Sequence, residues 1–442
     1  MSSITRMQSA GEPRRSLGLV ATTSLVIGNM VGSGIFLLPA SLAAYGAYSL
    51  WGWVISTAGA LLLARVFSRL SRRAPLAGGP YAYPREVFGD FAGFLLAWMY
   101  WISIAAAVAA IAVAFVSYLT ALVPSLGTHH AAGAGAAIAT CWLLTGVNIL
   151  GVRVAGRLQI ITVILKLSPL LMFALWGVFY FDPHMLAAGG TGQSTPAAID
   201  SCAALTMWAF VGLECATVPT DHVKDPEKTV PRATLYGTLI AAVFYILCTT
   251  AVMGIVPAES LAHSNAPFAD AAKALWGGWA GDLIAAAAVI SCFGALNGWI
   301  LMSGQFPQAV ARDNLFPKLF EKESHRGTPA GGLVFSSIVG TLLILMSYSR
   351  GLVSAFNAII LISVFFTLVP YMLCSMAELL LGRGDQARRR NVVLTSLAFA
   401  FALWAAAGTG RDSLYWGTLL MLAGLPLYAW QKWRQAEKAP HA

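Results

Sequence analysis

The sequence has little charge, and this shortage is the first clue to its class. Only 11% of its 442 residues are charged, 58% are hydrophobic, and the mean hydropathy is +0.71. A soluble protein carries about 25% charged residues. Apolar stretches of about 18 residues or more recur along the chain, as they do in membrane-spanning helices. The composition therefore excludes a soluble protein and predicts an all-α integral membrane protein.

Residues that would support other kinds of chemistry are also missing. The six cysteines lie in apolar segments without a CxxC spacing, so we expect no disulfide framework and no metal site. The glycine-rich stretch "GGPYAYPREVFG" (78–89) has no preceding strand and no following Lys-Ser or Lys-Thr, so it is not a phosphate-binding loop. No predicted span holds a buried set of catalytic or metal-binding side chains. We therefore expect neither an ATP-driven pump nor an enzyme, and no cofactor.

Twelve spans are predicted, at 17–40, 48–66, 91–122, 131–149, 158–181, 199–220, 233–256, 278–306, 331–349, 352–376, 391–409 and 412–430. They give an N-terminal tail (1–16), a core (17–376), two further helices (391–430) and a C-terminal tail (431–442). With both termini in the cytoplasm, all but four of the 28 Lys and Arg residues fall in the tails and cytoplasmic segments. Cations resist translocation, so this distribution predicts that orientation and explains the net charge of +9 without nucleic acid. The N-terminal tail has no signal-peptide cleavage site, and we expect it to be retained.

Two predicted spans contain residues that disfavour a continuous helix. The first has three glycines in "GNMVGSGIFLLP" (28–39), and the sixth has Gly212 and Pro219 in "MWAFVGLECATVPT" (207–220). Glycines at such spacing also form packing faces, which is the structural alternative. We expect the first span to break within 29–35 and the sixth around 211–213. Interruptions five spans apart favour an inverted repeat of 17–181 and 199–376, whose unwound stretches meet at mid-membrane. Freed N–H groups bind a carboxylate and freed carbonyls an ammonium, so we predict a site for a small zwitterion, an amino acid.

Several motifs resemble those of one family. They are "GNMVGSGIFLLPASLA", "AGGPYAY", "WAFVGLECATV", "VKDPEKTVPRA", "GWILMSGQ", "DNLFPKLF" and "FFTLVPY". From about Ser16 to Trp430 the chain resembles the amino acid/polyamine/organocation superfamily. Within it, the chain is most similar to the basic amino acid/polyamine antiporters, whose best-known member exchanges arginine for agmatine. The resemblance implies a secondary transporter of the bacterial inner membrane that exchanges a basic amino acid for its decarboxylated amine by alternating access.

Glu214 is the only acidic residue predicted deep inside a span. An ionisable group at that depth is costly unless it is paired or used, so a functional role is the default hypothesis. An acid neutralised by a hydrogen bond is the structural alternative. By resemblance, Glu214 forms an inner gate with Tyr100 and Tyr371 beneath the substrate. Its burial makes it a candidate for coupling transport to protons.

The resemblance also implies a substrate pocket. Trp299 matches a tryptophan that stacks on the substrate's cationic side chain, an interaction worth about 2 kcal/mol when desolvated, although a tryptophan on an apolar helix is usually a packing residue. Trp208 matches an outer aromatic gate, and Ser363 matches a polar pocket residue. Asn29 and Ser33 are expected to contact the α-amino and α-carboxylate groups. The remaining expected substrate contacts are Gly32, Gly34, Ser103, Ile104 and Ala209.

Two features depart from the arginine/agmatine pattern. The third span has Ile104 and Val108 where we would expect polar groups facing a guanidinium. Lys166 is the one cation predicted inside a span, and a lysine on helix 5 replaces sodium in proton-coupled members of the superfamily. A buried ammonium can titrate during transport, which makes Lys166 a second candidate for proton coupling, with snorkelling as the alternative. These features keep proton-coupled or exchange transport of neutral amino acids as an alternative function. Substrate identity, stoichiometry and the formation of a homodimer stay open.

Overall fold

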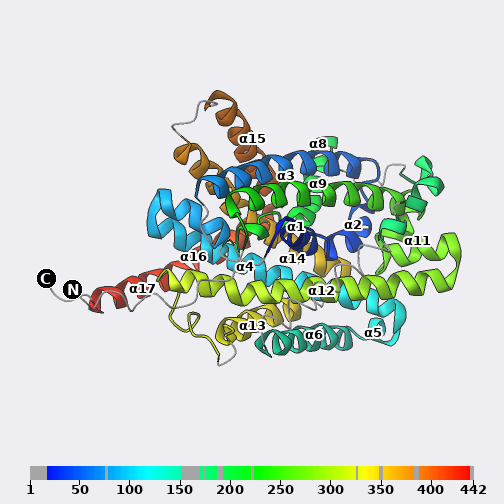
Figure 1. The fold of residues 1–442 in the computed structure, drawn as a ribbon. Coiled ribbons are helices and arrows are strands. Elements are labelled where there is room, and N and C mark those ends of the chain that lie inside the picture. Colours follow the sequence, from blue (N-terminus) through cyan, green and yellow to red (C-terminus); the bar gives the residue numbers. More distant parts are fainter. Residues whose placement is uncertain are drawn as a thin grey trace.

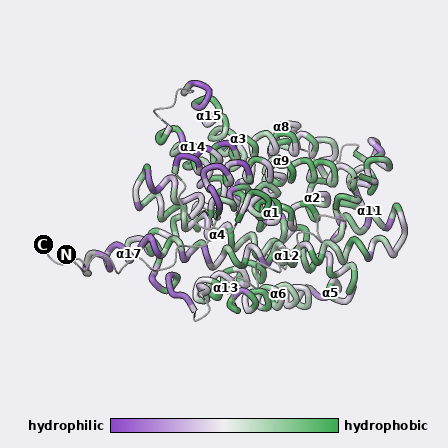
Figure 2. The backbone as a smooth tube through the Cα atoms, in the orientation of Figure 1, coloured by the Kyte–Doolittle hydropathy of each residue, from purple (hydrophilic) through white to green (hydrophobic). Residues whose placement is uncertain are grey.

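The computed structural model describes residues 17–74, 78–150, 170–173, 175–186, 193–218, 220, 223–324, 327–347, 352–382 and 388–438. Within these residues the structure is helical, and its one β feature is an isolated bridge between Leu17 and Val223. Nine helical segments of the described chain are long and apolar enough to cross a membrane. Figure 2 shows these apolar stretches, with hydrophilic residues gathered mainly at one end of the bundle. The all-α membrane class predicted from composition is confirmed.

Helices of ten or more residues form the bundle. They are α1 (Leu19–Met30), α2 (Ser33–Ala43), α3 (Tyr48–Arg73), α4 (Ala82–Leu122), α6 (His130–Leu150), α8 (Thr195–Met207), α9 (Pro226–Met253), α11 (Pro267–Trp276), α12 (Gly278–Arg312), α13 (Ala330–Ser347), α14 (Leu352–Leu381), α15 (Arg388–Ala407), α16 (Arg411–Leu422) and α17 (Leu425–Lys438). Shorter helical turns connect them. They are η1 (Gly79–Tyr81), α5 (Ser125–Thr128), η2 (Val178–Tyr180), η3 (Pro183–Leu186), η4 (Trp208–Phe210), η5 (Cys215–Thr217) and α10 (Ala258–Ala262).

The bundle is built around α4. This helix packs against α12 and α14, and every residue from Met99 to Tyr118 is buried. A helix that is apolar on all faces, as α4 is, belongs in an interior. Figure 1 shows α3, α8 and α9 along one side of the bundle and α6, α12 and α13 along the other. The short helices α1 and α2 lie between these two sides, next to α4, α9 and α12.

Two predicted boundaries differ from the structure near α4 and α17. The helix α4 begins at Ala82, ahead of the predicted span 91–122, and Gly89 (φ 81°, ψ −177°) separates this first part from the rest. The predicted span 412–430 is wrong as a single helix, because α16 ends and α17 begins within it. Pro426 has no N–H to continue the α16 hydrogen-bond ladder. A Cβ at Gly424 would lie 2.8 Å from Cδ1 of Trp98, so the chain turns close against α4 there.

Candidate functional site

The first predicted helix interruption is present. The helix α1 ends at Met30 and α2 begins at Ser33, and Gly32 between them has φ −144° and ψ −130°. A Cβ at Gly32 would lie 2.9 Å from the Cβ of Ala295 on α12, which is closer than carbon atoms pack. Glycine therefore allows the broken segment to approach α12 closely. The predicted break within 29–35 is confirmed.

The second predicted interruption is also present. The α8 helix ends at Met207, η4 follows, and the chain makes turns through 211–214 before η5. Gly212 has φ +105°, a left-handed conformation that strains any residue with a Cβ. The N–H of Gly212 donates to Oε2 of Glu214, two residues later in the chain, at 3.2 Å. The predicted break at 211–213 is confirmed.

The two breaks meet at Trp299 of α12. The indole Nε1 of Trp299 donates to the main-chain carbonyl of Asn29 at 3.2 Å. Its Cζ2 would lie 3.5 Å from a Cβ at Gly212. A Cβ at Gly34 would lie 3.2 Å from the Cα of Ala209, so α2 and η4 are also in direct contact. The structure thus brings predicted residues from both breaks together around one buried indole.

Two buried polar atoms at the first break have no hydrogen-bond partner among the described residues. They are Oδ1 of Asn29 and Oγ of Ser33. The other amide atom, Asn29 Nδ2, lies 3.7 Å from Sδ of Met302, and that sulfur lies 3.5 Å from Sγ of Cys215. A buried polar atom without a partner is costly, and an amide oxygen and a hydroxyl are suitable partners for an ammonium and a carboxylate. Met302 and Cys215 are absent from the predicted set, although Met302 follows Trp299 by one helical turn.

A buried carboxylate joins three elements beside the second break. Tyr100 of α4 donates to one oxygen of Glu214, and Tyr371 of α14 donates to the other. The Glu214 side chain is 0% exposed. The ring of Tyr371 meets Phe67 of α3 edge to face at 5.0 Å, and the ring of Tyr100 meets Phe306 of α12 at 4.9 Å. The three residues expected at a gate are therefore in contact, and moving α4 or α14 away from the second break would break these hydrogen bonds.

The serines expected in the pocket bond to the main chain. Ser363 Oγ donates to the carbonyl of Ser103 at 2.9 Å, and Ser103 Oγ donates to the carbonyl of Tyr100 at 2.8 Å. The Ser363 hydroxyl thus links α14 to α4, whereas the Ser103 hydroxyl bonds within α4. A substrate would have to compete for both hydroxyls. Ile104 is fully buried one helical turn after Tyr100, and Trp208 meets Phe356 of α14 edge to face at 6.4 Å.

Val108 does not line this site, contrary to the expectation from sequence. Its Cγ1 would lie 3.5 Å from a Cβ at Gly340 on α13. Trp101, seven residues earlier, donates to Ser336 of the same helix at 2.9 Å. Seven residues bring an α-helix back to almost the same face, so this face of α4 points toward α13. Val108 therefore no longer counts as a departure from the basic-antiporter pattern, whereas Ile104 still does. The other departure, Lys166, lies outside the described residues.

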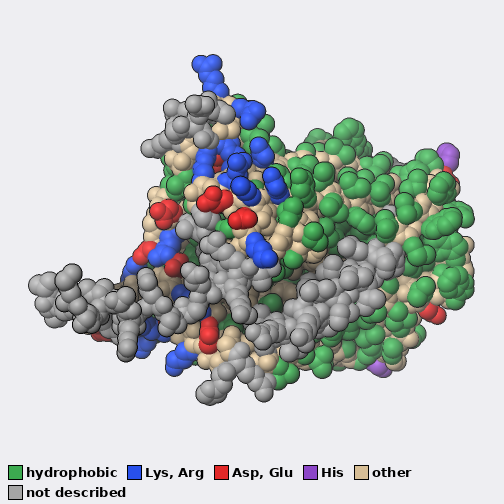
Figure 3. Space-filling view, viewed as in Figure 1, with side chains coloured by type: hydrophobic (Ala, Val, Ile, Leu, Met, Phe, Trp, Pro, Cys, Tyr) green, Lys and Arg blue, Asp and Glu red, His purple; other side chains and the backbone are tan. Residues whose placement is uncertain are grey.

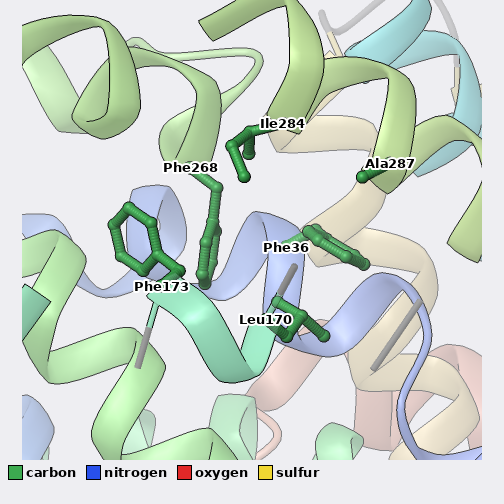
Figure 4. Close-up of a pocket in the computed structure, with 6 residues that line it drawn as sticks. All are labelled: Phe36, Leu170, Phe173, Phe268, Ile284 and Ala287. Carbon is green, nitrogen blue, oxygen red and sulfur yellow. The ribbon is translucent and has the colours of Figure 1, made fainter. Parts of the chain in front are cut away.

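The residues at the breaks are enclosed. Asn29 is 4% exposed, Trp208 5% and Trp299 2%, so a substrate reaches them only when helices or side chains move. Figure 4 shows a pocket in another place, between α2, α11 and α12. Its lining is Phe36, Leu170, Phe173, Phe268, Ile284 and Ala287. These side chains are all apolar, so the pocket does not suit a zwitterion.

Broken helices that meet over a buried carboxylate inside an apolar bundle define the class of secondary transporters with discontinuous helices. The comparisons agree. The sequence model described as amino acid permease matches residues 17–414. The cadaverine/lysine antiporter of Escherichia coli (strain K12) is 37% identical over 426 residues, 94% of this chain and 95% of that protein. The putrescine transporter PotE of the same strain is 32% identical over 418 residues, 93% of this chain and 95% of that protein.

A solved structure gives the same fold. The manganese transporter of Eremococcus coleocola has a TM-score of 0.60 at 13% identity and covers 93% of each chain. At this identity the likeness concerns the fold alone. The chain belongs to the amino acid permease family, and the predicted resemblance to the basic amino acid/polyamine antiporters is confirmed. The alternative of a neutral amino-acid transporter is not favoured.

Proposed function

We propose that this chain exchanges a basic amino acid for its decarboxylated amine, with lysine and cadaverine as the first pair to test. The observation that carries the proposal is the meeting of both helix breaks at Trp299. An indole face attracts a cation, and carbonyls at a helix break attract an ammonium. Lysine and cadaverine are the pair in the name of a relative that is 37% identical over 94% of this chain.

Each predicted contact has a role in this proposal. Asn29 and Ser33, whose unpartnered oxygens are buried at the first break, bind the α-amino and α-carboxylate groups. The main chain at Gly32 and Gly34 supplies further partners, and Trp299 stacks on the cationic side chain. The contacts that complete the pocket are Ser103, Ile104, Trp208, Ala209 and Ser363. Cadaverine lacks the carboxylate, so it would engage the same ring and carbonyls without the N–H groups.

Glu214 is proposed as the inner gate and as a site of proton coupling. Its hydrogen bonds to Tyr100 and Tyr371 connect the second break to α4 and α14. A proton on the carboxyl group would remove one acceptor and weaken this closure. Lys166 remains a second proposed site of proton coupling.

We further propose twelve spans, ten of them in a five-plus-five inverted repeat and two after it, with both termini in the cytoplasm. The breaks at the first and sixth predicted spans support the repeat. The orientation is supported by Figure 3, in which Lys and Arg side chains gather at the end of the molecule where α17 lies in Figure 1. A homodimer stays a proposal without a described contact.

The function is tested in vesicles reconstituted with the purified chain and loaded with cadaverine. Uptake of labelled lysine is expected to depend on internal cadaverine and to be inhibited by external cadaverine. The panel includes arginine with agmatine, ornithine with putrescine, and leucine and alanine as neutral controls. Uptake of leucine that exceeds uptake of every basic amino acid would contradict the proposal.

A further inference from the structure

Five exposed cations lie where α3 and α9 reach the same end of the bundle. They are Arg65 and Arg72 of α3, Lys224 just before α9, and Lys228 and Arg232 of α9. Figure 3 shows Lys and Arg side chains gathered beside the ends of these helices, where the apolar surface stops. Their charged groups make no ion pair or side-chain hydrogen bond with any described residue.

Other cations at this end have acidic partners. Arg73 lies 2.7 Å from Glu378, and Lys432 lies 3.0 Å from Asp90. The acids described beside the five cations are Asp225 and Glu227, both exposed at the start of α9. Two acids against five cations leave an excess of positive charge on this surface.

The helix register brings two of these cations to the same height. Trp53 of α3 stacks on Tyr245 of α9 with ring centroids 5.6 Å apart. The helices run antiparallel, because the N–H of Gly78, just beyond α3, donates to the carbonyl of Val218, just before α9. Arg65 follows Trp53 by 12 residues and Arg232 precedes Tyr245 by 13. At 1.5 Å per residue they lie about 18 and about 20 Å from the stacked pair.

Helix length puts this height close to the border of the hydrocarbon layer. The 28 residues of α9 span about 42 Å, which exceeds a hydrocarbon core of about 30 Å. Beyond Arg232, the lipid-facing surface of α9 carries Tyr236, Leu239 and Val243, each about half exposed. A cation at this border, without a protein acid, has the phosphate of a lipid headgroup as its natural counter-ion.

We propose that Arg65 and Arg232, assisted by Lys228, bind the headgroup of an anionic phospholipid between α3 and α9. A guanidinium can hold a phosphate through two parallel hydrogen bonds. Helices in contact lie about 8–10 Å apart, so one headgroup can reach both arginines. The acyl chains would lie along Tyr236, Leu239 and Val243, which have the exposed apolar character that such chains require.

The test is native mass spectrometry of the delipidated full chain with added phosphatidylglycerol. Wild-type protein is compared with Arg65→Gln/Arg232→Gln. The matched control is Lys318→Gln/Lys322→Gln, which removes the same charge from two exposed positions after α12. A cation near an anionic lipid is worth a factor of about five in affinity, so the arginine variant should bind about twenty-five-fold more weakly. The lysine control should bind as the wild type does.

Competing ligands and a charge-conserving variant distinguish a headgroup site from general electrostatic attraction. Phosphatidylcholine should not compete, and inorganic phosphate should compete only weakly, because the acyl chains contribute to binding. Arg65→Lys/Arg232→Lys keeps the charge, so it should retain most of the affinity for phosphatidylglycerol. Retained binding would also show that a chain substituted at positions 65 and 232 folds. Equal loss in the lysine control, or unchanged binding in the arginine-to-glutamine variant, would overturn the proposal.

Discussion

Replacement of Trp299 by leucine should distinguish cationic from neutral substrates. The indole of Trp299 is 2% exposed and is in contact with both helix breaks. Loss of a desolvated cation–π contact costs about 2 kcal/mol, which weakens binding about thirtyfold. The Nε1 hydrogen bond to the Asn29 carbonyl is worth about 1 kcal/mol, and its loss disturbs the first break for every substrate alike. Lysine and cadaverine should therefore lose about thirtyfold more affinity than a neutral amino acid.

The assay is equilibrium binding of labelled lysine and leucine to purified wild type and Trp299→Leu. Trp299→Phe is the matched control, because it keeps an aromatic face and removes the N–H donor to Asn29. Trp299→Phe should retain much of the preference for lysine over leucine. It should also lose the affinity for both ligands that depends on the hydrogen bond to Asn29. The reasoning is refuted if lysine and leucine lose affinity equally in Trp299→Leu, or if the wild type binds no cationic ligand.

Three further changes test the gate, the first break and the packing around α14. Glu214→Gln should leave lysine binding nearly unchanged and flatten the pH dependence of exchange; an unaltered profile would leave Glu214 with a structural role only. Gly32→Ala should lower thermal stability by about 1–3 kcal/mol through its 2.9 Å approach to the Ala295 Cβ, and Ala295→Gly should restore most of it. No recovery in the double variant would show that backbone conformation, not this contact, requires glycine. Glu378→Ala removes the buried partner of two arginines and should lower the free energy of unfolding by about 3–5 kcal/mol. Thr395→Val removes a hydrogen bond to the same carboxylate and should lower it by about 1 kcal/mol. Equal losses in the two variants, measured by thermal unfolding, would contradict an ionic role for Glu378.

The helix breaks could be predicted because their cause is local. Glycines at 32 and 34 and at 212 weaken a helix wherever they occur, and the structure uses them for close approach and for a positive φ. The contact of Glu214 with Tyr100 and Tyr371 has no local cause. These residues come from three distant parts of the chain, so without the structure only the family resemblance predicts that they meet.

Other features depend on neighbours that the sequence does not reveal. From its place in the third span, Val108 is expected to face the substrate, but the orientation of α4 that directs Trp101 toward α13 also directs Val108 toward that helix. The sulfur of Met302 beside Asn29 required knowledge of how α12 faces the first break. The break before α17 has a local signal in Gly424 and Pro426. The residues on both sides are apolar, however, so hydropathy alone predicts one continuous span.

The contacts of α14 indicate which of its connections, to α3 or to the second break, should separate first when the transporter opens. Tyr371 and Glu378 lie seven residues apart, on the same face of this helix. Glu378 is 1% exposed and lies 2.7 Å from both Arg69 and Arg73 of α3, so separating α14 from α3 would cost about 3–5 kcal/mol. The hydrogen bond between Tyr371 and Glu214 is worth about 1.5–3 kcal/mol even when the carboxylate is charged, and less when it is protonated. Opening at this end should therefore detach the second break from α14 while α14 and α3 stay together, as expected if Glu214 is the proposed site of proton coupling.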